Sequence, residues 1–171
     1  RRTLAVRFPE VSEEKLFDAW CAASRVFPEI TRVFWGDIDL KWFPEACLSH
    51  PRHRGFYTVR HFIEGVTMPG SGILDILEWR EKVLRKEPPG GRTPLEVADA
   101  LSAHSATALR IVSELRPREG SNQELRWTLG DLEAMARLGA YYAEKIPGAC
   151  DLALFDATGD PERRAPAVTH L

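Results

Sequence analysis

Residues 121–149, SNQELRWTLGDLEAMARLGAYYAEKIPGA, decide the fold that the sequence predicts. Apolar side chains recur at every third or fourth position of this stretch, which is the spacing of one face of an α-helix. The residues that share this face are Leu125, Leu129, Leu132, Met135, Leu138, Tyr142, Ile146 and Ala149. Ser121 and Glu124 have the spacing of a capping box, and Pro147 is expected to kink or split the helix. The stretch therefore predicts a long amphipathic helix.

A second strong helix signal precedes this stretch. Thr93-Pro94-Leu95-Glu96 combines an N-cap residue, proline at the first helical position and a glutamate placed to close a capping box. Apolar residues then continue at helical spacing as far as Leu115. Gly139 and Ala143 are small residues on the inner face of the following helix, so we expect two helices to approach closely there.

The remaining elements are shorter. Ser12 predicts the N-cap of a helix that runs to about Val26, and Pro28 opens another short helix. Further helices are expected over residues 44–49, 57–64 and 73–86, and after the turn at 158–161, whereas residues 3–8 are read as a short strand or an extended lead-in. Since the strong signals are helical and the connections short, we predict an all-α fold. It is an array of antiparallel helix pairs with one irregular loop region around 36–56.

Length and charge limit the class of protein. The chain has 171 residues, which predicts a single helical domain over 1–171. Its 23 basic and 25 acidic residues give a net charge of −2, which argues against nucleic acid as a partner. No apolar run approaches the ~20 residues that cross a bilayer, so no membrane partner is expected. Because the chain starts without Met and ends inside an unfinished helical pattern, we expect a fragment of a longer protein.

The most unusual composition lies at 34–45, FWGDIDLKWFPE, where four aromatic and three acidic side chains lie within twelve residues. Aromatic rings that stack on sugar rings, beside carboxylates that accept hydrogen bonds from hydroxyl groups, are typical of sugar sites. A basic loop follows, whose arginines suit a uronate or phosphate group. The candidate ligand-binding residues are Trp35, Asp37, Asp39, Trp42 and Arg52. The alternative is that the tryptophans anchor a loop in the core while the acids and the basic loop stay solvated.

A metal site is a weaker candidate in the same region. Cys47, His50 and His53 are spaced three apart, and a fourth ligand would come from Asp39, Glu45 or His61. The two-plus-two arrangement of a structural zinc site is missing. We therefore expect no metal, no cofactor and no catalytic residue in this chain; a small metal enzyme remains the third interpretation.

Three stretches carry a resemblance to a known kind of region: residues 14–20 with Ala23 and Ser24, residues 35–47, and residues 139–146. Together they resemble the helical C-terminal region that follows the catalytic barrel in α-glucuronidase-like glycoside hydrolases. The resemblance implies a carbohydrate-active parent protein and an all-α accessory region at a dimer contact or at the rim of a sugar site. Catalytic residues would then lie on the barrel, outside this chain.

Two functions follow as hypotheses. The first is a non-catalytic helical accessory domain of a carbohydrate-active, glycoside hydrolase-like protein, which contributes to glycan binding. The alternative is a helical protein-interaction or dimerisation module without a small ligand, because the apolar face from Leu125 to Ala149 exceeds what one domain is expected to cover. The partners to expect are a carbohydrate, a second copy of the chain, or a catalytic domain of the same chain.

Overall fold

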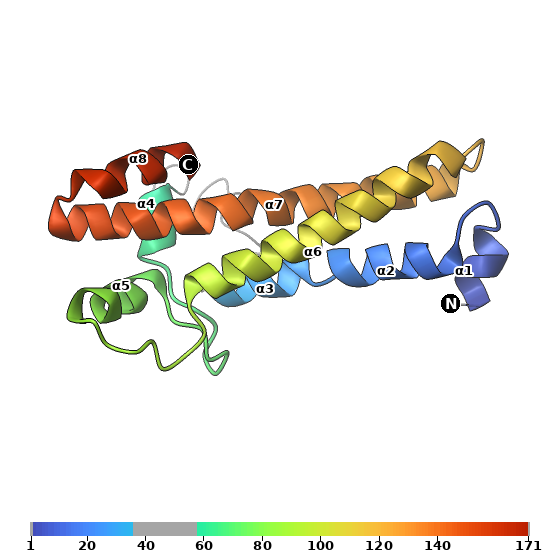
Figure 1. Cartoon of the computed structure of the whole chain (residues 1–171). Coiled ribbons are helices and arrows are strands. Elements are labelled where there is room, and N and C mark those ends of the chain that lie inside the picture. Colours follow the sequence, from blue (N-terminus) through green and yellow to red (C-terminus); the bar gives the residue numbers. More distant parts are fainter. Residues whose placement is uncertain (1, 36–57, 171) are drawn as a thin grey trace. The chain divides into compact units, whose positions relative to one another are not determined.

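The computed structural model describes residues 2–35 and 58–170, and the regular elements in these ranges are helices (Figure 1). In chain order they are α1 (Arg2–Arg7), α2 (Glu13–Ala23), α3 (Val26–Val33), α4 (Val59–Ile63), α5 (Ile76–Arg85), α6 (Pro94–Leu115), the 3₁₀ helix η2 (Arg116–Arg118), α7 (Gln123–Thr158) and α8 (Pro161–His170). The β-type pairing seen in the described residues consists of isolated bridges, Trp35 with Val66 and Ile73 with Arg92. The predicted all-α class is confirmed. No helix in these two ranges has the length and apolar character needed to traverse a lipid bilayer.

Contacts divide the chain into two compact units. Unit 1 contains the residues up to Pro28 together with Ala100–Tyr141. Unit 2 contains the described parts of Glu29–Asp99 and of Tyr142–Leu171. Helices α3, α6 and α7 contribute residues to both units. The single domain expected over 1–171 stays a prediction, and each unit is described separately.

Unit 1 is built on an antiparallel hairpin of α6 and α7, with α1 and α2 beside it (Figure 1). Helices α2, α6 and α7 fold this way because each buries one apolar stripe and leaves the opposite side to solvent. The stripes meet in a core that contains Phe8, Leu16, Ala19, Ala23, Ala108, Val112, Leu115, Leu125, Leu129, Leu132 and Ala136. The burial of Leu125, Leu129 and Leu132 confirms the inner face predicted from the sequence.

Gly139 sets a close approach inside unit 1. A Cβ atom at this position would overlap the Oγ of Ser105 on α6 and the side chain of Val26. The small residue is therefore required by packing, as the sequence predicted. A larger side chain would force these neighbours apart.

Unit 2 holds an aromatic core. Phe34 and Phe62 stack with ring centroids 5.5 Å apart, and Phe62 meets Tyr142 at 6.0 Å. Ion pairs add to this packing within the same unit. Arg92 bonds Glu29 at 2.7 Å, and Arg163 of α8 bonds Asp151 of α7 at 3.1 Å.

Three of the predicted helix starts carry N-caps, and two of these caps, Ser12 and the Thr93–Glu96 box, were expected from the sequence. Ser12 Oγ accepts a bond from the Lys15 amide at 3.3 Å. Thr93 and Glu96 form the predicted capping box, in which the Glu96 carboxylate accepts from the Thr93 amide at 2.7 Å and the Glu96 amide donates to Thr93 Oγ1 at 3.2 Å. Asp160 Oδ1 accepts from the Glu162 amide at the start of α8. These polar side chains satisfy backbone amides that have no partner within the helix.

Three local predictions are wrong. Residues 3–8 are not extended, because Arg2–Arg7 forms α1, which lies against α2. The cap of α7 is Asn122 rather than Ser121, since Asn122 Oδ1 accepts from the Leu125 amide at 3.0 Å. The split expected at Pro147 is wrong, since α7 continues to Thr158, whereas the kink, the other expected outcome, stays a prediction. A helix can tolerate one missing amide donor where packing along its length compensates. The short helix expected at 44–49 and the loop region at 36–56 lie outside the described residues.

Candidate functional site

Within unit 1, α7 carries apolar residues on two opposite sides. The inner side, with Leu125, Leu129 and Leu132, is fully buried. On the other side Trp127 is 63% exposed and Tyr141 is 47% exposed. Large aromatic side chains that remain in water on a regular helix are candidates for binding, because burying them in a complex is favourable.

The exposed aromatic residues belong to one line along the helix. Trp127, Ala134 and Tyr141 are each seven residues apart. With 3.6 residues per turn, they fall within about 20° of a line opposite the buried Leu125. We call this surface the outer face of α7; it consists of Trp127, Gly130, Asp131, Ala134, Arg137, Leu138 and Tyr141.

The centre of the outer face is shallow. A Cβ atom at Gly130 would meet no other atom within 4 Å, and Ala134 carries only a methyl group. The aromatic rings of Trp127 and Tyr141 stand at either end of this small-residue stretch. A side chain of a second protein can therefore fit between them.

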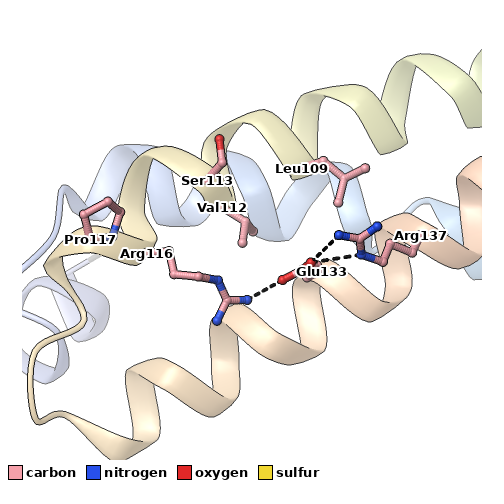
Figure 2. Close-up of a pocket in the computed structure, with 7 residues that line it drawn as sticks. All are labelled: Leu109, Val112, Ser113, Arg116, Pro117, Glu133 and Arg137. Carbon is pink, nitrogen blue, oxygen red and sulfur yellow. Dashed lines mark hydrogen bonds and ion pairs between the residues drawn. The ribbon is translucent and has the colours of Figure 1, made fainter.

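A groove of about 640 Å³ borders the same part of α7 and separates it from α6 (Figure 2). Its lining residues are Leu109, Val112, Ser113, Arg116, Pro117, Glu133 and Arg137. Figure 2 shows the Arg116 and Arg137 guanidinium groups both turned toward the Glu133 carboxylate. Arg137 donates to Glu133 Oε1 from Nε at 2.9 Å and from Nη2 at 2.7 Å.

The chemistry of this groove is that of an ion pair. Hydrogen bonds from Arg137 and then Arg116 hold the pKa of Glu133 below its usual range. A carboxyl group that acts as a general acid needs a raised pKa, and one that acts as a general base must not already be held in an ion pair. Glu133 has neither property, so its role is to tie η2, which follows α6, to α7 at the groove.

Among the residues that the structure describes, the amine with the most strongly shifted pKa lies in unit 2. Lys145 is only 8% exposed, and its Nζ lies 4.9 Å from the centre of the Phe62 ring and 5.5 Å from that of Tyr142. Burial lowers the pKa of Lys145 to about 8. The aromatic faces offset part of the cost of burying the charge. The arrangement explains how a lysine can occupy an aromatic core.

Of the five ligand-binding residues predicted from the sequence, the structure describes one, Trp35. Trp35 is 44% exposed, and its amide donates to the Val66 carbonyl at 2.7 Å. The other predicted residues, Asp37, Asp39, Trp42 and Arg52, lie outside the described residues.

The same holds for most of the metal candidates, since Asp39, Glu45, Cys47, His50 and His53 also lie outside that range. His61 is described, and its Nδ1 is 3.0 Å from both the amide and the hydroxyl of Thr58 at the start of α4. Residues 2–35 and 58–170 contain no group of three side chains able to hold a metal ion.

One prediction behind the interaction module is wrong. The apolar face from Leu125 to Ala149 was expected to exceed what the chain can cover, but Leu125, Tyr142 and Ala149 are all buried. The uncovered aromatic surface is on the opposite side of the helix, and Leu138, which was predicted to share the inner face, is only partly buried and lies on that opposite side. Sequence reasoning missed Trp127 and Tyr141, although their heptad spacing through Ala134 was a readable signal.

Comparison of the chain with protein-family models, with curated proteins and with solved structures gave no match. The residues of the chain are therefore the basis for a functional assignment.

Proposed function

We propose that the chain is a non-catalytic helical module that binds other polypeptides through the outer face of α7. The observation that carries the proposal is the pair of exposed aromatic side chains, Trp127 and Tyr141, on a helix whose inner side is already buried. Tryptophan and tyrosine are enriched among residues that dominate binding energy at protein interfaces.

The arrangement of unit 1 supports this function. Trp127 does not belong to the buried core of unit 1, so its ring contributes little to folding and is available for binding. The aromatic groups stand on a regular helix, which keeps their spacing fixed and lowers the entropic cost of association. A partner helix that packs in the small-residue stretch would contact both rings.

The test is a comparison of two variants. Trp127→Ser removes the larger ring from the outer face, and Trp20→Ser removes a tryptophan that is 42% exposed on α2 of the same unit. Immobilised wild-type and variant chains are incubated with an extract of the source cells, and bound proteins are quantified by mass spectrometry. We expect proteins retained by the wild type and by Trp20→Ser to be lost with Trp127→Ser; the chain itself counts among them. Identical retention by all three proteins would contradict the proposal.

The second candidate function is glycan binding. The chain would then be a non-catalytic accessory domain of a glycoside hydrolase-like protein. The exposed ring of Trp35 favours it, because a tryptophan with free surface can stack on a sugar ring. The bond from Trp35 to Val66 fixes the backbone at that position.

Calorimetric titration with uronic-acid oligosaccharides tests this candidate. Binding by the wild type that is lost in Trp35→Ala and Trp42→Ala but kept in Trp127→Ser would support a glycan site. No binding by the wild type would remove it and leave the protein-binding proposal intact.

A further inference from the structure

The groove of about 640 Å³ between α6 and α7 has an apolar floor beneath a charged rim (Figure 2). The apolar lining residues are Leu109, Val112 and Pro117. Val112 is buried, and Leu109 is partly buried against the core of unit 1. Leu109 and Pro117 are eight positions apart, so the floor is about 12 Å long at 1.5 Å per residue. An apolar cavity of this size with a few polar groups is typical of sites for small organic molecules.

The rim of the groove belongs to a network with an excess of positive charge. Glu133 forms ion pairs with Arg116 and Arg137. Glu119 forms ion pairs with Arg116 and with Arg126, each at 3.6 Å. Among the described residues, the network therefore joins three guanidinium groups to two carboxylates, which leaves one positive charge uncompensated.

The arginines of the groove keep donors for another acceptor. Arg137 donates to Glu133 from Nε and Nη2, and Arg116 donates to the same carboxylate from Nη2. A guanidinium has five N–H donors, so each arginine retains N–H groups beyond those that Glu133 uses. The Arg137 side chain is 70% exposed, and a molecule in the groove can therefore reach it.

We propose that this groove binds a small organic monoanion, a carboxylic acid with an unbranched apolar chain. Its carboxylate bonds Arg116 and Arg137, and its chain lies over Leu109 and Val112. One negative charge matches the excess on the rim, whereas a dianion such as a phosphate monoester exceeds it. The inference is independent of the polypeptide binding proposed for the outer face of α7, which the groove only borders.

Glu133 gives this site a property that distinguishes binding from mere structural support. Its carboxylate uses the same guanidinium groups as the ligand, and the two negative charges repel each other. Loss of the charge at Glu133 is therefore expected to strengthen binding, whereas loss of the charge at Arg137 is expected to weaken it. A residue that only kept the groove in shape would weaken binding when it is replaced.

Calorimetric titration of the full chain with octanoate tests the proposal, and octanol and acetate are the uncharged and the short-chain comparisons. We expect octanoate to bind with a Kd of about 1 mM or tighter, and the other two compounds to bind about threefold or more weakly. In a chain with labelled methyl groups, octanoate should shift the NMR signals of Leu109 and Val112. The signals of Leu84, which is exposed on α5 in unit 2, should stay in place.

Three variants test the charges. Arg137→Gln should weaken octanoate binding by about threefold to tenfold, because it removes a charged donor. Glu133→Gln should strengthen it by about threefold. Arg25→Gln is the control, since Arg25 is exposed in unit 1 and does not line the groove, and it should bind like the wild type. Circular dichroism checks that each variant is folded.

A wild type that does not bind octanoate, or binds octanol equally well, overturns the proposal. Methyl shifts that leave out Leu109 and Val112 overturn the location. These measurements use the wild type and decide the matter even if a variant fails to fold. Unchanged binding by Arg137→Gln overturns the role of the guanidinium groups, and unchanged or weaker binding by Glu133→Gln overturns competition between its carboxylate and the ligand.

Discussion

The inner and outer faces of α7 in unit 1 both carry apolar side chains at helical spacing, yet only the inner face forms the core. The inner face carries branched side chains, such as those of Leu129 and Leu132, which are fully buried. The outer face has aromatic residues at its two ends and small residues at its centre, and Trp127 is 63% exposed. The difference shows that apolar periodicity alone does not separate a folding face from a binding face. Side-chain size and the position of charges do.

The largest effect is expected from a cavity on the inner face. Leu132→Ala should lower the free energy of unfolding by about 2–5 kcal/mol, because it removes buried methyl groups and leaves a void. The matched change on the outer face, Leu138→Ala, should cost less than about 1 kcal/mol, because Leu138 is only partly buried. Urea denaturation followed by circular dichroism measures both. Equal losses would contradict the distinction between the faces.

Overpacking at Gly139 comes next. Gly139→Val should lower the free energy of unfolding by about 1–3 kcal/mol, because the new side chain overlaps Ser105 and Val26. Gly130→Val adds the same atoms on the outer face, where a Cβ meets open space, and serves as the control. Thermal denaturation distinguishes them. A loss at Gly130 as large as the loss at Gly139 would mean that the outer face is already covered in the single chain.

The capping box of α6 has a smaller effect. Thr93→Ala should lower the free energy of unfolding by about 1 kcal/mol, since it removes the side-chain oxygen that accepts from the Glu96 amide. Thr107→Ala, the same substitution at an exposed position inside this helix, is the control, and its expected change is within about 0.5 kcal/mol. Chemical denaturation of the two variants measures the difference. Similar stabilities would show that the cap is not needed for α6.

The smallest effect concerns pH and the ion pair at the groove. The pKa of Glu133 is lowered by Arg137 and Arg116, so the ionised carboxylate stabilises the fold above its ordinary value of 4.5. This contribution is fully present above pH 4.5 and is lost as the pH falls through the lower pKa of the folded protein. Glu133→Gln should therefore reduce the melting temperature slightly at neutral pH and flatten its fall in acid. An unchanged acid profile would show that the ion pair contributes nothing.

Much of the helical framework could be predicted from the sequence because it depends on local signals. Ser12, the Thr93–Glu96 box and the inner leucines act through spacings that are visible along the chain. The start of the chain was predicted wrongly, because the pairing of α1 with α2 is a tertiary contact that overrides weak local preference. Pro147 was expected to kink or split the helix, and the split is wrong because α7 continues through this residue to Thr158.

The candidate site was harder to predict. The densest aromatic and acidic composition lies at 34–45, and of this segment the structure describes Phe34 and Trp35. Trp127 and Tyr141 are far apart in the sequence and become one surface only once the register of α7 and its buried side are known. Their heptad spacing was present in the sequence, but the same spacing also fits a buried stripe. Exposure is the property that distinguishes the two, and it follows from tertiary packing.

The most direct test of the outer face of α7 as a binding surface is crosslinking from its centre. A photoreactive amino acid replaces Ala134 on the outer face or, as the control, Ala106 at an exposed position of α6. Each chain is irradiated in an extract of the source cells, and covalent adducts are identified by mass spectrometry. We predict adducts with a polypeptide from position 134 and few from position 106. No adduct from position 134, or equal amounts from the two positions, would contradict a binding role for the outer face.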